Sequence, residues 1–289
     1  MMKAEVQIEI RRENIHDHSV YYRRCGSGQP LLLVHGWPFH GGSFEKLMRF
    51  LGNSFSCFAP DLPGMGETSF NDKTDFSFAG QAQFLAAFAK AAIKEPYICI
   101  AHNTGATMAR LMALSSDSHM GALVLLNTEI PGHRPPCIGF YQTFLLWPGA
   151  RSILRFLISL DLFRTSPMGY GGCFSDSRML NQDFVGSFVA PLIERPDRLE
   201  GVVRYLCGLD FSVVDSLADL HKDIKIPVHM IWGEDDPTFP LKFAREMVRQ
   251  FNAPPDLCTI PGTKFLAYME QPDRVAALVH EFCVGLALR

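Results

Sequence analysis

Apolar segments of strand length alternate along this chain with segments that have the pattern of amphipathic helices. This alternation limits the possible folds more than any other feature of the sequence. PLLLVHG (30–36) and PYICIAH (96–102) are almost wholly apolar. A strand of this composition is buried on both faces, as in a parallel sheet that carries helices on each side. We therefore predict an α/β fold with a doubly wound, mostly parallel sheet.

The alternation stops in the middle of the chain and then resumes. Residues 131–220 have helical patterns without clear strands and are rich in aromatic rings, some of which we expect to line an apolar pocket. Strand patterns return with VHMIWG at 228–233. We therefore predict a core domain formed by residues 1–130 and 221–289, with a helical cap at 131–220 inserted after the sixth strand. A chain of 289 residues is long enough for one large domain with such an insertion.

Charge and motifs narrow the range of functions. The formal net charge is −3 at pH 7 and no cluster of Lys and Arg stands out, so we expect no nucleic-acid partner. No G-x-G-x-x-G motif follows the first strand and no P-loop motif occurs, which argues against a nucleotide cofactor. The eight cysteines lack metal-ligand spacing, so we expect neither a metal nor another cofactor. Scattered cysteines in apolar segments are typical of a reducing cytoplasm.

Membrane segments are not expected either. The longest apolar runs are far shorter than the roughly 18 residues that a spanning helix needs, and the N-terminus lacks a signal-peptide pattern. The sequence therefore predicts a cytoplasmic protein without a membrane partner. Its oligomeric state cannot be predicted.

Five motifs carry a resemblance to a known family. They are HGWP (35–38), DLPGMGETS (61–69), AHNTG (101–105), WGEDDPTFP (232–240) and PGTKFLAYMEQPDRVA (261–276). In this order they resemble the α/β-hydrolase superfamily, and most of all its haloalkane dehalogenase and epoxide hydrolase branch. The resemblance covers nearly the whole chain. It implies an α/β-hydrolase fold with a nucleophile elbow after the fifth strand, a cap over the site and a small-molecule substrate or ligand.

The expected nucleophile position holds an asparagine. In the superfamily the nucleophile stands on a tight strand-to-helix turn, with small residues two positions before and two after it. Ala101 and Gly105 meet this rule around Asn103. Thr104 is a second candidate, but the bulky His102 would then stand two positions before it. An Asn carboxamide does not readily form the covalent ester intermediate that Asp or Ser forms at this position.

The base position is altered as well. The family's histidine precedes a glutamate by six residues, and this register places Lys264 there, with Glu270 as the glutamate. Asp236 matches the family's orienting acid, and Asp235 is the competing choice. Lysine is protonated at neutral pH unless burial lowers its pKa, and an ion pair with Asp236 would keep it charged. The predicted catalytic set is therefore Asn103, Lys264 and Asp236, a degenerate form of the usual triad.

The resemblance further implies that an oxyanion hole is kept. Its donors would be the backbone N–H groups of Trp37 and Thr104, with Gly36 and His35 from the adjoining turn as part of the binding site. His35 more often has a structural role in this fold. Asn127, at the end of the sixth strand, is expected to bond local backbone.

Three functions are compatible with these motifs. The sequence favours an enzyme that acts on a small, mostly apolar molecule by non-covalent chemistry, such as proton transfer, a lyase or cyclase step, or atypical hydrolysis, with Lys264 as proton donor or base. The first alternative is a receptor-like protein that binds a ligand without turning it over. The second is a hydrolase of the epoxide hydrolase or dehalogenase type, which Asn103 disfavours. The substrate itself cannot be predicted, because the fold does not determine it.

Overall fold

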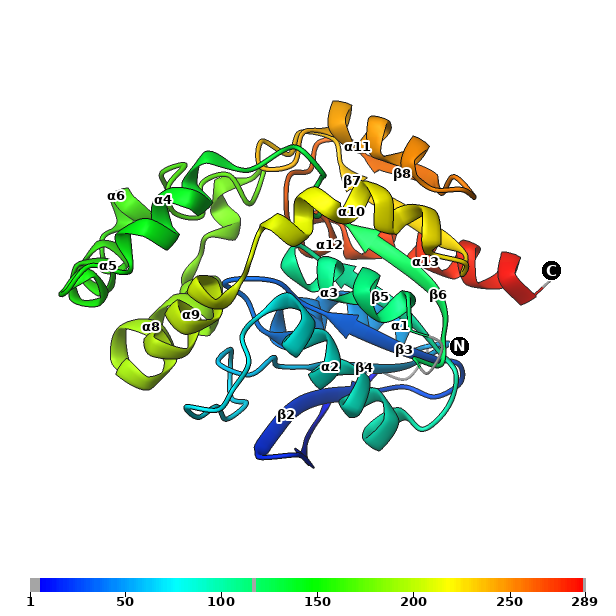
Figure 1. The fold of residues 1–289 in the computed structure, drawn as a ribbon, viewed down its shortest axis with the longest axis horizontal. Coiled ribbons are helices and arrows are strands. Elements are labelled where there is room, and N and C mark those ends of the chain that lie inside the picture. The colour runs from blue at the N-terminus through cyan, green and yellow to red at the C-terminus, as the bar shows by residue number, and fades with distance from the viewer. Residues whose placement is uncertain (1–5, 116–117, 288–289) are drawn as a thin grey trace.

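An eight-stranded sheet forms the centre of the molecule and carries helices on both faces (Figure 1). The structure is a computed structural model and describes residues 6–115 and 118–287. The strand order is β1-β2-β4-β3-β5-β6-β7-β8. β2 is antiparallel to β1 and β4, and the other neighbours are parallel. The predicted doubly wound, mostly parallel sheet is therefore confirmed. The strands are β1 (Glu9–Ile15), β2 (His18–Cys25), β3 (Pro30–Val34), β4 (Ser56–Pro60), β5 (Tyr97–His102), β6 (Met120–Leu126), β7 (Val228–Gly233) and β8 (Asp256–Ile260).

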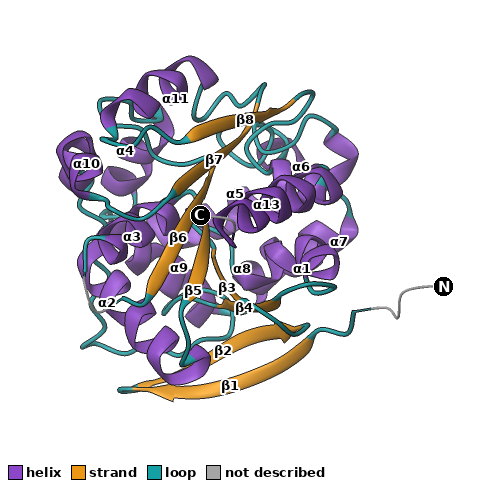
Figure 2. Ribbon diagram, turned by 90° about the vertical axis from the view of Figure 1, so that its right-hand side faces the viewer, coloured by secondary structure: helices purple, strands orange, loops and turns teal. Residues whose placement is uncertain are grey.

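Helices cover both faces of the sheet (Figure 2). Every residue of β3, β4 and β5 is buried, which explains why these strands are apolar throughout rather than alternating. One face is covered by α1 (Glu45–Leu51) and α13 (Pro272–Ala287), which pack against each other. The other face is covered by α2 (Phe78–Phe88), α3 (Thr104–Ala113) and α10 (Ser212–Asp223), while α11 (Leu241–Met247) lies near β7 and β8.

The segment between β6 and β7 forms a separate helical lobe (Figure 1). Rings from this lobe pack on the core, since Phe39 contacts Tyr170, Phe184 and Phe188. α10 differs from the rest of the segment, because it packs on α3 of the core. The limits of 131–220 for the cap remain a prediction. The lobe contains α4 (Pro136–Phe144), α5 (Ala150–Ser159), α6 (Asp161–Arg164), α7 (Gln182–Phe184), α8 (Ala190–Glu194) and α9 (Pro196–Gly208).

Short turns of helix complete the described chain. They are η1 (Gly41–Phe44), η2 (Ala89–Ile93), η3 (Ser177–Met179), η4 (Val185–Val189), η5 (Val248–Gln250) and α12 (Ala267–Glu270). No helix within residues 6–115 and 118–287 has the length and hydropathy needed to cross a bilayer. The eight cysteines are free thiols.

Candidate active site

Asn103 occupies the tip of a sharp turn between β5 and α3. Its backbone has φ +53° and ψ −138°, a region that residues other than glycine rarely adopt. The turn is closely surrounded: a Cβ atom on Gly105 would lie 2.2 Å from the His35 carbonyl oxygen, and one on Gly36 would lie 2.5 Å from Asn103 Cβ. The two glycines therefore allow the turn to approach the end of β3. This geometry agrees with the small-residue rule that the sequence obeys on both sides of Asn103.

The carboxamide of Asn103 is bonded to the backbone around it. Its Oδ1 accepts a hydrogen bond from the Thr104 N–H, and its Nδ2 donates to the Trp37 carbonyl oxygen at 3.3 Å. The Trp37 N–H in turn donates to Thr104 Oγ1 at 3.1 Å. Both N–H groups expected in the oxyanion hole therefore have acceptors within the chain. A ligand oxygen would have to displace Asn103 Oδ1 or Thr104 Oγ1 to use them.

The hydroxyl of Thr104, the alternative nucleophile, bonds to no carboxylate or imidazole among the described residues. Its Oγ1 lies 3.0 Å from the hydroxyl of Tyr205, a buried residue of the cap. Burial raises the pKa of Tyr205, so this phenol does not take up a proton from Thr104 at neutral pH. A threonine hydroxyl needs an adjacent base to become a nucleophile, and these contacts do not supply one.

Asp236 is buried just beyond the end of β7. Its Oδ2 accepts a hydrogen bond from Asn127 Nδ2 at 2.7 Å, and its Oδ1 accepts one from the Thr238 N–H at 2.8 Å. Burial raises the pKa of Asp236 to about 6, although these hydrogen bonds oppose the rise. Asn127 also accepts from the Gly233 N–H at 2.9 Å. Asn127, which we expected to bond local backbone, bonds instead to the Gly233 N–H and to Asp236, and so joins the ends of β6 and β7.

The raised pKa makes a prediction for Asp236→Asn. Below pH 4 the carboxyl is protonated in both the folded and the unfolded protein; between pH 4 and 6 only the folded protein keeps the proton. Ionisation of Asp236 therefore lowers stability as the pH rises through this window. The ionisation of Asp236 should cost wild type about 1 kcal/mol of unfolding free energy between pH 5 and pH 8, and Asp236→Asn should not show this loss. Urea unfolding at both pH values measures this. The exposed Asp235→Asn serves as control, and an equal difference at both pH values would contradict the assignment.

Lys264 does not form the ion pair that we expected with Asp236. Among the described residues, no carboxylate makes an ion pair with its ammonium, and Asp236 is already bonded to Asn127 and Thr238. The backbone N–H of Lys264 donates to Glu270 Oε2 at 2.8 Å. Glu270 Oε1 accepts from the Ser175 N–H of the cap at 2.7 Å. Glu270 therefore fixes the loop after β8 against the cap.

An apolar cavity of about 130 Å³ lies beside Asn103, between core and cap. Asn103 is the one residue of the predicted catalytic set among the described residues that line it; Lys264 and Asp236 are not. Phe265, the neighbour of Lys264, does line the cavity, and its ring packs on that of Phe239 at a centroid distance of 5.9 Å. This position is not among the predicted site residues. The apolar run FLAYM that begins at Phe265 is the signal that could have indicated it.

The titratable groups that line this cavity keep their protons at neutral pH. They are two thiols and two phenols, and burial raises the pKa of each, that of Tyr141 to about 12. None of them takes up a proton near pH 7, and the Tyr141 O–H already donates to the Met168 carbonyl oxygen. The Tyr170 hydroxyl has no hydrogen-bond partner among the described residues, so it is free to donate to a ligand. The four are Cys137, Cys173, Tyr141 and Tyr170.

A recess of about 30 Å³ adjoins the cavity and contains a carboxylate that the sequence analysis also missed. Glu129 lines this recess together with Asn103 and Thr104. Its Oε2 accepts hydrogen bonds from Thr107 Oγ1 at 3.1 Å and Thr128 Oγ1 at 2.9 Å. Burial raises the pKa of Glu129. Glu129 therefore links α3, through Thr107, to the segment that follows β6, through Thr128.

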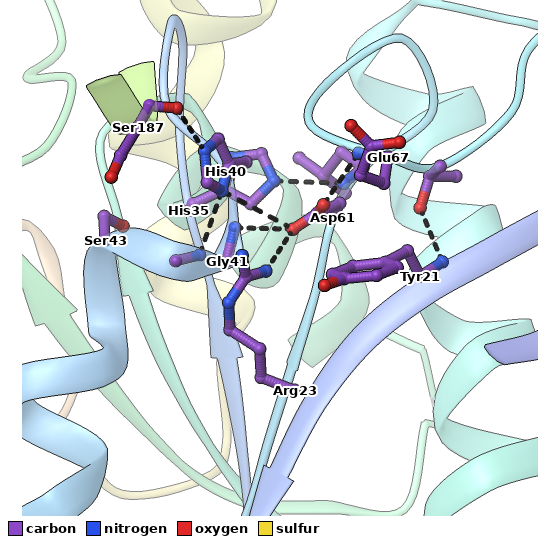
Figure 3. Close-up of polar contacts among 12 residues, drawn as sticks. Tyr21, Arg23, His35, His40, Gly41, Ser43, Asp61, Glu67 and Ser187 are labelled. Atoms are coloured by element: carbon purple, nitrogen blue, oxygen red, sulfur yellow. Dashed lines mark hydrogen bonds and ion pairs between the residues drawn. The ribbon is translucent and has the colours of Figure 1, made fainter. Parts of the chain in front are cut away.

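The HGWP and DLPG motifs form a polar network on the other side of the elbow (Figure 3). Asp61 Oδ1 accepts from Arg23 Nη1 at 2.9 Å and from the Gly41 N–H at 2.8 Å. His35 Nε2 accepts from the Leu62 N–H at 3.0 Å. His35 therefore has the structural role that the sequence analysis considered for it, in addition to its place beside the elbow.

Comparison with known proteins places the chain in a family. The sequence model of the family described as "Alpha/beta hydrolase family" matches residues 31–278. The chain belongs to the α/β hydrolase family. A pimeloyl-[acyl-carrier protein] methyl ester esterase of Yersinia enterocolitica is 24% identical over 272 residues, which are 91% of this chain and 96% of the esterase.

Solved structures show the same fold. Haloalkane dehalogenase DbeA from Bradyrhizobium elkani has a TM-score of 0.79 at 17% identity, over 98% of this chain and 99% of that one. Epoxide hydrolase CorEH has a TM-score of 0.79 at 18% identity, over 97% and 100%. This α/β hydrolase therefore has the α/β-hydrolase fold that the motifs implied. At such low identity the similarity concerns the fold, not the substrate.

Proposed function

We propose that this α/β hydrolase holds a small, mostly apolar molecule in the cavity beneath the cap, without forming a covalent intermediate at Asn103. The observation that carries the proposal is the cavity lining itself. The side chain at the elbow is a carboxamide bonded to Trp37 and Thr104, and no described group that lines the cavity takes up a proton near pH 7. Covalent hydrolysis needs both a nucleophile and a base. Binding needs neither.

The cavity limits the kind of ligand. Its volume of about 130 Å³ is similar to that of cavities that hold a single benzene ring. Its wall is mainly aliphatic and aromatic, with Leu154, Val202 and Phe265 as examples. The free hydroxyl of Tyr170 can donate to one polar atom of the ligand. A compact apolar molecule with one carbonyl or hydroxyl oxygen therefore matches this wall.

A second candidate is the non-covalent enzyme that uses Lys264 and Asp236. It is favoured by the pKa of Asp236 near 6, in the range where a carboxylate can exchange protons with a substrate. Both charged groups also act on the pKa of the Cys173 thiol, Asp236 raising it and Lys264 lowering it. The two groups therefore lie within electrostatic reach of the cavity wall, although neither lines it.

One experiment separates the candidates. Small aromatic alcohols and ketones are screened by thermal shift and, with esters, epoxides and haloalkanes, for turnover. We expect bound ligands to raise the Tm of wild type, and to raise that of Val202→Trp much less because indole fills the cavity. Tyr170→Phe should weaken binding about fivefold to tenfold through loss of one hydrogen bond. Tyr205→Phe, which changes a phenol outside the cavity, is the matched control.

Any turnover of a screened compound would show that the protein does more than bind its ligand. Turnover that is lost in Lys264→Met and Asp236→Asn, with a midpoint near pH 6, would establish the second candidate. Turnover that is lost in Asn103→Ala, with a covalent adduct in the intact mass, would overturn the proposal and support ordinary hydrolysis.

A further inference from the structure

Large apolar side chains are exposed mainly on one part of the cap. Of the eleven such residues among the described side chains, eight lie between residues 140 and 168. Leu162 is 84% exposed, Leu146 is 73% exposed and Trp147 is 67% exposed. Isolated exposed apolar residues are normal on a soluble surface, but a contiguous group of them marks a binding surface. The eight are Phe140, Leu146, Trp147, Ile153, Phe156, Leu160, Leu162 and Met168, and we refer to them as the cap patch.

α5 shows how the cap patch is built. Its buried residues, Ala150, Leu154 and Ile158, recur every four positions and face inward, where the latter two line the cavity. Ile153 and Phe156 lie on another side of the same helix, which is exposed. α5 is therefore apolar on two sides, and the cavity accounts for only one of them. Polar residues, Arg151 and Arg155 among them, occupy the third side of the helix.

The segment that carries the cap patch has more basic than acidic residues, although the whole chain has a net charge of −3. Residues 136–172 contain three arginines and a single acidic residue. Arg151 is paired with Glu200, and Arg164 is paired with Asp161. Arg155 is exposed and has no ion-pair partner among the described residues. An apolar helix face beside an unpaired arginine complements an anionic, apolar surface.

The cap patch also reaches the cavity beside Asn103. Met168 is both 38% exposed and part of the cavity lining, so the exposed apolar residues meet the cavity wall at Met168. The helices that carry the patch lie at the far end of the lobe, away from the core (Figure 1). An apolar face of this kind can be buried in the boundary between lipid headgroups and acyl chains.

We propose that the cap patch binds the surface of a lipid bilayer that contains anionic lipids, and that apolar ligands enter the cavity from that surface. This inference rests on the proposed function for the ligand, but not for the membrane contact. It departs from the expectation of no membrane partner, which depended on the absence of spanning segments, because binding in the plane of the interface needs no spanning helix. Bilayer contact would bury Phe156, Leu162 and Trp147, and would place Arg155 at the lipid headgroups.

Flotation with vesicles tests the membrane contact. Wild type should float with vesicles of phosphatidylcholine and phosphatidylglycerol, and less with phosphatidylcholine alone, with the difference reduced at high salt. Phe156→Ser combined with Leu162→Ser should weaken binding at least about tenfold. Arg155→Glu should weaken binding to the vesicles that contain phosphatidylglycerol and leave binding to pure phosphatidylcholine vesicles unchanged. Phe50→Ser removes an apolar side chain that is 48% exposed on α1 of the core, and should bind as wild type does.

Tryptophan fluorescence gives a second readout. The chain has three tryptophans; Trp232 is fully buried, Trp37 is half-buried, and Trp147 is the exposed one. Vesicle binding should therefore shift the emission to the blue, and Trp147→Phe should lose the shift while it still floats. Wild type that floats with neither vesicle type would overturn the proposal. The proposal would also be overturned if vesicles do not bind and light scattering shows a dimer that Phe156→Ser combined with Leu162→Ser disrupts.

The two proposals fail separately. Phe156 and Leu162 do not line the cavity, so their double variant should keep the ligand-induced rise in Tm in buffer without vesicles. Loss of vesicle binding with ligand binding retained would confirm that the patch acts on the membrane contact. If wild type binds vesicles but none of the screened compounds raises its Tm, the proposed function is contradicted and the membrane contact is not.

Discussion

Three buried histidines that are neutral in the fold should together remove about 6 kcal/mol from the unfolding free energy of this protein when the pH falls from 7.5 to 5. Burial lowers the pKa of His35 to about 4 and that of His102 to about 3. Burial and the nearby charge of Arg110 lower the pKa of His221 to about 3. Domains of this kind have a total stability of about 5–15 kcal/mol, so we expect the protein to be marginal near pH 5.

The sign follows from which state binds the protons. Below pH 6.5 the unfolded chain protonates these histidines while the folded chain does not, so stability falls as the pH falls towards the folded pKa values. Asp236 works in the opposite direction, since its folded pKa is raised, but its gain over the same range is only about 1 kcal/mol. The net result is a loss of stability in acid.

The hydrogen bonds show why each ring resists a proton. His35 Nε2 accepts from the Leu62 N–H, and His221 Nε2 accepts from Arg110 Nη1 at 3.1 Å, so a proton at either nitrogen would replace an acceptor by a second donor. His102 Nε2 donates to the Phe265 carbonyl oxygen at 3.1 Å, and its buried Nδ1 has no partner. A proton there would leave a charge among aromatic rings without compensation.

His102→Gln provides the measurement. The glutamine amide can still donate to the Phe265 carbonyl oxygen, but it does not titrate. The slope of unfolding free energy against pH between 5 and 6 should therefore fall by about 1.4 kcal/mol per pH unit, one third of the combined slope of the three histidines. Urea unfolding in closely spaced buffers measures it. His280→Gln, at an exposed histidine, is the matched control. An unchanged slope in His102→Gln would show that His102 is protonated in the fold.

The sequence predicted the sheet and the elbow because both depend on local rules. Buried parallel strands must be apolar, and a tight elbow must have small residues at 101 and 105. These constraints act within a few residues, so they can be read without knowing the tertiary contacts.

The loop after β8 could not be predicted in the same way. Whether residue 264 or 265 faces the cavity depends on Glu270, which bonds both Lys264 and Ser175 of the cap, and on the rings that receive Phe265. The bond from Ser175 to Glu270 joins segments 95 residues apart, and the rings that receive Phe265 come from Phe39 and Phe239, in other parts of the chain. Aromatic residues in the cap gave a similar ambiguity. Composition does not distinguish Phe163, which lines the cavity, from Phe156, which is 63% exposed.

Ester hydrolysis should be gained by Asn103→Ser combined with Phe265→His, and not by Asn103→Ser combined with Lys264→His. Serine at 103 supplies a nucleophile, and removal of Asn103 Oδ1 frees the Thr104 N–H to stabilise an oxyanion. A histidine at 265 would line the same cavity as residue 103. A positioned base accelerates such a step by about 10²–10⁴-fold, so the gain over Asn103→Ser alone should be at least about 10²-fold. Hydrolysis of short p-nitrophenyl esters measures it.

The comparison of the two double variants decides which residue stands at the base position. The family register places Lys264 there, six residues before Glu270, whereas Phe265 is the residue that lines the cavity. Both substitutions introduce the same imidazole one residue apart, so each controls for the chemistry of the other. Equal or greater activity with Lys264→His would support the counted register and the Asn103, Lys264 and Asp236 set. Activity with Phe265→His that is lost when Asp236→Asn is added would show that the acid still occupies its place in the fold, and that the chain lacks only the nucleophile and the base.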